Sequence, residues 1–164
     1  MQEAKDGKVI QGNQFLNPYE LGCVLSHIEV IEKAKAKQLP YVLIFEDDVT
    51  FPLDFDYQFQ QCLNDLPEDW DLFYLSGTPK QTPQRVTNNI SKCGGMWGTF
   101  GYMVRESIYD FLLFELGRQR LTADNCLIKI SGLLIVYCAK NKLISHAAGY
   151  SYIAQKERIV SWLI

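Results

Sequence analysis

The sequence has no long apolar run, no cluster of basic residues and no closely spaced cysteine pair. Its apolar runs are far shorter than the roughly 20 residues that a transmembrane helix needs, and residues 1–6 lack the apolar centre of a secretory signal, so we expect no membrane span. Lys and Arg number 16 against 19 Asp and Glu, which argues against nucleic acid as a partner. The sequence therefore indicates a globular, cytoplasmic protein.

The cysteines indicate a reducing compartment. They are odd in number and widely spaced, and no Cys-x-x-Cys motif is present. Most of them lie in apolar surroundings, where a free thiol behaves as a small hydrophobic group, and we expect no disulfide. They are Cys23, Cys62, Cys93, Cys126 and Cys138.

The alternation of helix-like and strand-like segments predicts one α/β domain over residues 1–164, and a hydrophobic content of 48% is ample for a core. Asn17 is a predicted helix cap, followed by Pro18 in the first turn and by Glu20 at the third position. The expected elements are a helix to about 38, a strand at 41–45, a helix from 54 to 66, a strand at 71–76, a long loop at 78–92, a strand ending at 104, helices at 106–116 and from 122 or 124, and a strand at 133–138.

Three carboxylates, Glu46, Asp47 and Asp48, directly follow the apolar run at residues 41–45. This run predicts a strand buried on both faces of a parallel sheet, and ligands of open α/β sheets bind at such strand ends. Gathered carboxylates repel one another unless a cation or hydrogen-bond donors neutralise them, and oxygen ligands suit Mg²⁺ or Mn²⁺. The triplet therefore predicts a metal-phosphate site; the alternative is a solvated acidic turn.

Several blocks resemble the pattern of glycosyltransferase family 25, which includes lipooligosaccharide galactosyltransferases and the galactosyltransferase domains that act on collagen. They are Gly-Cys-x-x-Ser-His at 22–27, Glu-Asp-Asp-Val at 46–49, Asp-Trp-Asp at 69–71, and weaker matches at 98–102, 123–127 and 150–153. The resemblance implies a GT-A-like (Rossmann-like) α/β fold, with a mixed, mostly parallel sheet flanked by helices.

Residues 3–8 resemble the family's Glu-Ala-x-Asp-Gly-Lys segment, which in family members follows a first strand and helix. The resemblance therefore implies that the domain is N-terminally truncated and lacks a region expected to hold part of the nucleotide. A truncated enzyme, an alternative start and a remnant that binds without turnover remain alternatives. An exposed sheet edge left by the missing strand favours a homo-oligomer.

The resemblance also implies that a hexose is transferred from a UDP-sugar to a lipooligosaccharide or other surface saccharide, with inversion. It implies galactose as the hexose. A cation, Mn²⁺ or Mg²⁺, stabilises the charge of the departing nucleoside diphosphate. Asp48 is the expected direct ligand. Glu46 is a further ligand or, like Asp47, a contact to the ribose or a metal-bound water. His146 is another candidate ligand, and a surface loop histidine is its alternative.

Inverting transfer needs a base for the acceptor hydroxyl, and Asp124 is the predicted base. Its alternative is a carboxylate that interacts with a helix dipole. Ser26 and His27 are predicted to bind the donor by hydrogen bonds. Thr99, Trp97 and Tyr102 are predicted to line a sugar subsite, where an aromatic face packs on a pyranose, and a place in the core is the alternative for Tyr102.

Cys23 and His27 lie one helical turn apart in the predicted first helix. A Cys-His hydrolase is disfavoured, because one helical turn seldom gives a nucleophile and its base the required orientation. A zinc site is disfavoured because no second pair of ligands has suitable spacing. The alternative to a donor-site hydrogen bond from His27 is that Cys23 packs while His27 bonds a backbone group or the acidic strand end. The alternative function is a noncatalytic domain that binds a partner protein or saccharide.

Overall fold

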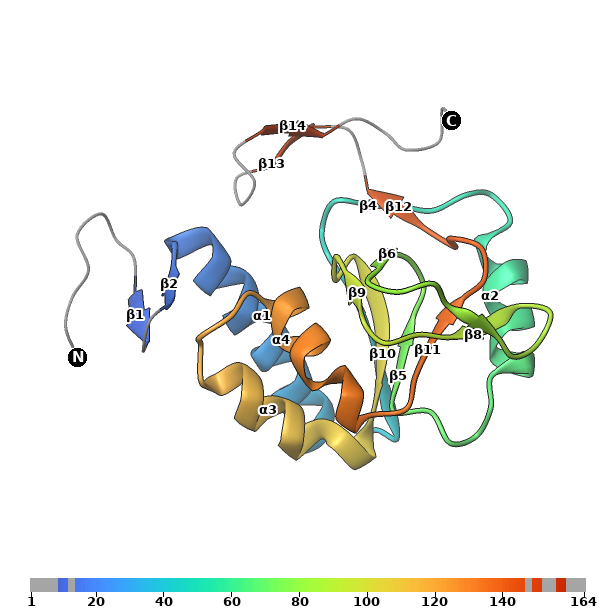
Figure 1. The fold of residues 1–164 in the computed structure, drawn as a ribbon, viewed down its shortest axis with the longest axis horizontal. Coiled ribbons are helices and arrows are strands. Elements are labelled where there is room, and N and C mark those ends of the chain that lie inside the picture. Colours follow the sequence, from blue (N-terminus) through green and yellow to red (C-terminus); the bar gives the residue numbers. More distant parts are fainter. Residues whose placement is uncertain (1–8, 12–13, 147–148, 152–155, 159–164) are drawn as a thin grey trace.

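A six-stranded mixed sheet lies between helices on its two faces (Figure 1) in the computed structural model, which describes residues 9–11, 14–146, 149–151 and 156–158. The strand order is β3-β10-β5-β11-β8-β7. These strands are β3 (Tyr41–Phe45), β5 (Leu72–Tyr74), β7 (Gln84–Arg85), β8 (Ile90–Lys92), β10 (Gly101–Arg105) and β11 (Val136–Ala139).

Three helices cover one face of this sheet and one helix covers the other (Figure 1). The first group is α1 (Pro18–Ala36), α3 (Tyr109–Gly117) and α4 (Ala123–Ile130), and the single helix is α2 (Phe55–Asp65). The remaining short elements are β1 (Val9–Gln11), β2 (Gln14–Leu16), β4 (Val49–Thr50), β6 (Thr78–Pro79), β9 (Met96–Trp97), β12 (Ser145–His146), β13 (Gly149–Ser151), β14 (Lys156–Arg158), η2 (Glu106–Ile108) and η3 (Ser131–Leu133).

The predicted start of α1 is confirmed. The Asn17 side-chain oxygen accepts hydrogen bonds from the backbone N–H groups of Tyr19 and Glu20, each at 2.9 Å. The Glu20 carboxylate accepts in return from the Asn17 N–H at 2.8 Å, which completes a capping box. The helix ends at Ala36, close to the expected residue 38.

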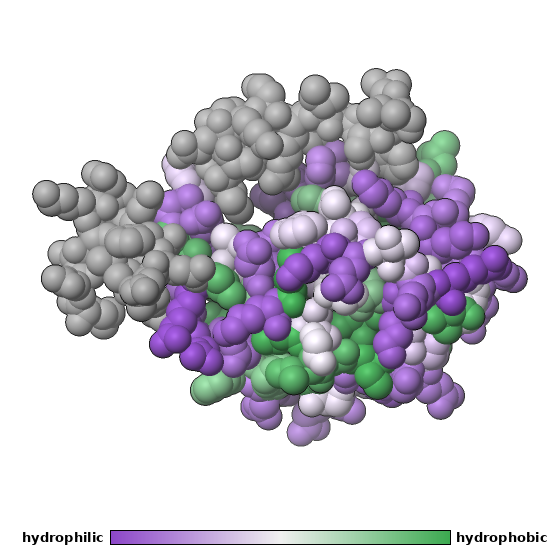
Figure 2. Space-filling model, in the orientation of Figure 1, coloured by the Kyte–Doolittle hydropathy of each residue, from purple (hydrophilic) through white to green (hydrophobic). Residues whose placement is uncertain are grey.

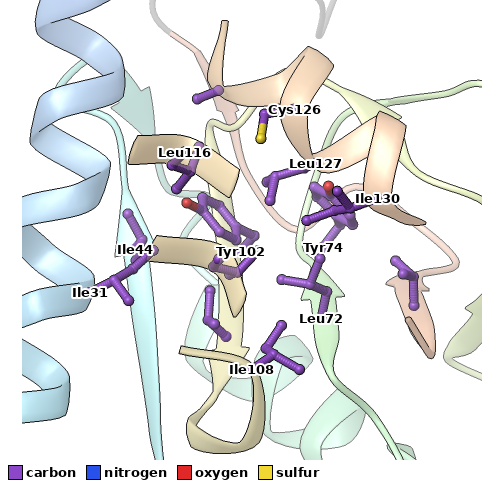
Figure 3. Close-up of a cluster of buried hydrophobic side chains, with 14 of the residues drawn as sticks. Ile31, Ile44, Leu72, Tyr74, Tyr102, Ile108, Leu116, Cys126, Leu127 and Ile130 are labelled. Atoms are coloured by element: carbon purple, nitrogen blue, oxygen red, sulfur yellow. The ribbon is translucent and has the colours of Figure 1, made fainter. Parts of the chain in front are cut away.

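Alternating side chains of the central strands fill two separate cores. In β5, Leu72 and Tyr74 belong to the core under α1, α3 and α4, whereas Phe73 belongs to the core under α2. Figure 3 shows Leu72 and Tyr74 beside Tyr102 of β10, beneath the helices of the first group. Because successive strand residues point to opposite faces, helices on both faces bury every side chain of β5.

The α/β fold with a mixed sheet is confirmed, but the expectation of mostly parallel strands is wrong. The pairing of β5 with β11 is parallel, and the other four pairings in the sheet are antiparallel. The apolar run at residues 41–45 predicted a strand buried on both faces and, from this, a parallel sheet. Helices on both faces bury the strands of this sheet whichever way the strands run, so burial does not fix strand direction. β3 lies at one edge of the described sheet, and pairing of this edge with a second copy of the chain stays a prediction.

The expected long loop at residues 78–92 contains the short strands β6, β7 and β8. Strands of two or three residues are too short to show a period of two in sequence. The strand expected at 133–138 begins at Val136, because residues up to Leu133 close η3. The motif at residues 3–8 and part of the motif at 150–153 lie outside the described residues.

Across the described part of the chain, no helix combines the length and apolar character needed to cross a bilayer. The face shown in Figure 2 carries hydrophilic side chains around a smaller apolar area.

Candidate functional site

A cavity of about 350 Å³ opens where the end of β3 meets the segment before β10. Because β10 runs antiparallel to β3, residues that precede β10 lie beside residues that follow β3. The Glu46 N–H donates to the Phe100 carbonyl at 3.0 Å and joins the two segments. The other walls come from α1, from Thr78 and from residues 122–125 at the start of α4.

Glu46 and Thr99, both predicted site residues, meet in this cavity. The buried Thr99 hydroxyl donates to Glu46 Oε1 at 2.5 Å. His27 Nε2 lies 3.9 Å from the same oxygen, and the Tyr102 hydroxyl hydrogen-bonds His27 Nδ1 at 2.9 Å. His27 is 4% exposed and does not line the cavity, so it supports Glu46 from beneath.

Burial lowers the pKa of His27 from 6.5 to about 4, although the Asp124 carboxylate opposes this shift. The imidazole is therefore neutral at pH 7, and its approach to Glu46 is not an ion pair at that pH. A neutral ring keeps one nitrogen lone pair for a hydrogen bond or a metal ion.

Lowering the pH is expected to destabilise the protein through His27. In the unfolded chain His27 binds a proton below about pH 6.5, whereas in the folded chain it binds one only below about pH 4. Its contribution is thus complete above pH 6.5 and falls by roughly 3 kcal/mol between pH 6.5 and pH 4. The measurement is urea unfolding of wild type and His27→Asn across this range. A constant difference in free energy of unfolding between the two proteins would contradict the shift.

Asp124 is held at the start of α4 by three donors. The Thr122 hydroxyl and the Asn125 N–H each donate to Asp124 Oδ1 at 2.7 Å, and the Gly98 N–H donates to Oδ2 at 3.4 Å. Gly98 has φ +87°, and a Cβ there would lie 2.5 Å from the Phe100 ring, so this position requires glycine. Asp124 is therefore placed both to act as a base, because it lines the cavity, and to interact with the helix dipole, because it lies in the first turn of α4.

His146 lies next to the acidic turn, although the two are far apart in sequence. β12 pairs with β4 so that His146 is opposite Val49, directly after Asp48. The His146 ring packs 4.6 Å from the Phe100 ring, measured between centroids. Asp47, Asp48 and His146 do not line the cavity, and Asp47 is exposed. The structure thus places the acidic turn and His146 beside the Glu46 wall of the cavity.

Ser26 faces away from the cavity. It is exposed on α1, and its hydroxyl donates to the Gly22 carbonyl at 3.0 Å. Trp97, by contrast, lines the cavity and keeps 44% of its surface exposed, so an aromatic face is available to a sugar.

Sequence reasoning missed four cavity residues: Glu20, Thr78, Thr122 and Asn125. Glu20 and Thr122 were predicted only as residues at the start of a helix. Asn125 follows Asp124 in the motif at 123–127, where the carboxylate alone was given a role. Thr78 had no signal, because the strand that begins there has two residues.

Cys23 also lines the cavity, as a protonated thiol. Burial, followed by the Glu46 carboxylate, raises its pKa from 9.0 to about 12. A thiol of this kind is a poor nucleophile, which argues against the Cys-His hydrolase. All five cysteines are free thiols.

Comparison with known proteins agrees with the motifs. Residues 8–127 match the family described as glycosyltransferase family 25 (LPS biosynthesis protein). The human inactive glycosyltransferase 25 family member 3 is 38% identical over 71 residues, which cover 42% of this chain and 12% of the relative. Procollagen galactosyltransferase 1-A of Xenopus laevis is 32% identical over 94 residues, 52% of this chain and 15% of the relative.

A third relative, procollagen galactosyltransferase 2 of Mus musculus, is 27% identical over 130 residues, 62% of this chain and 21% of that protein. The chain thus spans about a fifth or less of the length of these relatives. The family match covers most of the chain and contains the Glu46, Thr99 and Asp124 walls of the cavity. On this ground the chain belongs to glycosyltransferase family 25.

Proposed function

We propose that this chain transfers a hexose, with galactose as the leading candidate, from a UDP-sugar to a saccharide acceptor with inversion. The observation that carries the proposal is that Glu46 and Asp124, two of the three carboxylates in the cavity and from distant segments, line it together with Trp97. Membership of glycosyltransferase family 25 and similarity to procollagen galactosyltransferases support the reaction class and the sugar. A lipooligosaccharide or other surface saccharide is the proposed acceptor.

The residues beside the cavity fit a divalent cation. His146 Nδ1 is buried and has no hydrogen-bond partner among the described residues, and the pairing of β12 with β4 puts His146 next to Asp48. Imidazole nitrogen and carboxylate oxygen are suitable ligands for Mn²⁺, and carboxylates for Mg²⁺. We assign Asp48 and His146 as ligands, with Glu46 as a third ligand or a contact to a metal-bound water. When bound, the cation stabilises negative charge on the departing UDP.

Asp124 accepts the proton of the acceptor hydroxyl in this proposal. Its Oδ1 already accepts from Thr122 and Asn125, and among the described residues its Oδ2 receives only the long contact from the Gly98 N–H. The Oδ2 atom is thus the one placed for proton transfer. Thr99 holds the Glu46 carboxylate, and Trp97 offers its exposed face to the sugar.

The alternative is a noncatalytic domain that binds a partner protein or a saccharide. The similarity to the human inactive glycosyltransferase 25 family member 3 favours this alternative, because the two chains are 38% identical over 71 residues and the relative is described as inactive. In this case the cavity holds a ligand without turnover.

A transfer assay tests the proposal. The chain is incubated with UDP-galactose, Mn²⁺ and a panel of saccharides that includes lipooligosaccharide, and released UDP is measured. We expect UDP release that depends on the acceptor and stops when the cation is chelated. UDP release at the rate of the enzyme-free blank, for every nucleotide sugar and acceptor tried, would favour the noncatalytic alternative.

A further inference from the structure

Three potential metal ligands converge at the wall of the cavity. Cys23 and His27 lie four residues apart on one face of α1, and Glu46 follows β3. The ligand atoms of these three side chains all lie within 4.8 Å of one another. Among the residues that the structure describes, no other group of three or more His, Cys, Asp or Glu side chains meets in this way. Two ligands four residues apart on a helix are a known arrangement for zinc.

Neighbouring side chains hold two of these ligands in position. Tyr102 engages His27 Nδ1 and leaves Nε2 directed at Glu46, and Thr99 donates to the Glu46 carboxylate. The Tyr102 contact is on the ring nitrogen away from the cluster, and the Thr99 contact is on Glu46 Oε1, the oxygen that faces His27. Hydrogen bonds to metal ligands fix their orientation and raise metal affinity. The imidazole is neutral at pH 7 because of its burial, and this is the form that binds a metal.

The surroundings of the cluster carry negative charge. The Asp47, Asp48 and Asp124 carboxylates, together with Glu46, all raise the cost of a thiolate at Cys23. The same negative potential attracts a cation, whose charge offsets the repulsion. Cys23 and Glu46 line the cavity while His27 lies beneath it, so the cluster is closed on the protein side and open on the cavity side.

We propose that Cys23, His27 and Glu46 bind Zn²⁺, or another cation that prefers thiolate ligands, with a fourth coordination position open to the cavity. Binding releases the Cys23 thiol proton to solvent, and the sulfur, the Nε2 atom and one carboxylate oxygen become ligands. In tetrahedral zinc sites the ligand atoms lie about 3.5 Å apart, as bond lengths near 2.0–2.3 Å require. The 3.9 Å between His27 and Glu46 is close to this value, so the main adjustment is at the Cys23 side chain.

This site differs from the proposed Mn²⁺ or Mg²⁺ site in its other ligands and in the cation it selects, because thiolate ligands prefer softer cations. Glu46 belongs to both, so Zn²⁺ bound to Cys23 and His27 withdraws this carboxylate from the donor site. On the proposed function, which gives Glu46 its role in the donor site, zinc at this position opposes nucleotide binding.

A Co²⁺ titration of the purified chain without nucleotide tests the proposal, and its result does not depend on transferase activity. We expect a near-ultraviolet charge-transfer band from thiolate to Co²⁺ that saturates at one ion per chain and disappears when Zn²⁺ displaces Co²⁺. Cys23→Ser should remove the band. Cys62→Ser is the matched control and should keep it, because Cys62 lies in the core under α2, where its thiol contacts the Asn89 carbonyl.

A second measurement on the wild-type protein guards against misfolding of the Cys23 variant. Zn²⁺ should protect Cys23, the one half-buried cysteine, from alkylation, as mapped by mass spectrometry. Absence of the band in wild type, a band that survives in folded Cys23→Ser, or equal Cys23 alkylation with and without Zn²⁺ would each overturn the proposal.

Discussion

Replacing Asp48 with asparagine is expected to weaken cation-dependent UDP binding by at least about 100-fold, the upper range for loss of groups that support metal ligands. Asparagine keeps the volume of the side chain but removes the negative charge that attracts the cation. The free energy of unfolding should stay within about 1 kcal/mol of wild type, because Asp48 lies in the half-buried turn between β3 and β4. Titration calorimetry with UDP and Mn²⁺ measures the binding, and urea unfolding measures the stability.

Asp56→Asn is the matched control for Asp48. Asp56 is an exposed carboxylate in the first turn of α2, so the variant removes the same charge outside the proposed site. Its UDP affinity should remain within about threefold of wild type, since exposed charges are well screened by salt. A large destabilisation of Asp48→Asn with unchanged UDP binding would show that Asp48 is structural.

The second large effect is expected at Asp124. Asp124→Asn should lower the transfer rate by about 10²–10⁴-fold, the usual contribution of a general base, while UDP affinity changes less than about threefold. The asparagine oxygen can still accept from Thr122 and Asn125, so the start of α4 should remain intact. Steady-state kinetics should therefore show a fall in kcat with little change in the KM for the donor.

Asp110→Asn separates the two interpretations of Asp124. Asp110 occupies the first turn of α3 as Asp124 occupies the first turn of α4, but it is exposed and pairs with Lys35. Both variants remove a carboxylate that interacts favourably with a helix dipole, at a cost of about 0.3–1 kcal/mol of stability. If Asp124 acts only in this way, the two variants will lose similar stability and neither will lose turnover.

Local signals in the sequence predicted local structure well. Asn17, Pro18 and Glu20 act within one helical turn, and the capping box that they predict is present. Strand direction in the sheet is a non-local property. The antiparallel placement of β10 between β3 and β5 depends on contacts between segments far apart in sequence, which short apolar runs do not encode.

Helix geometry explains why one motif contained residues that face different ways. Ser26 and His27 are adjacent in the Gly-Cys-x-x-Ser-His block, but neighbouring residues on a helix point about 100° apart. His27 is buried against Tyr102, whereas Ser26 faces solvent. Cys23 and His27 share one face, and only the packing of α1 against the end of β3 brings Glu46 to them. In sequence, a zinc site is disfavoured because no second pair of closely spaced ligands is present. This criterion misses the cluster of Cys23, His27 and Glu46, in which the third ligand comes from a distant segment.

The most direct test of the proposed function is calorimetric titration of the wild-type chain with UDP, first with Mn²⁺ present and then with Mn²⁺ chelated. The roles proposed for Asp48, His146 and Glu46 predict binding that requires the cation. Equal binding in the two conditions would contradict the metal assignment, and no binding in either would contradict a functional donor site.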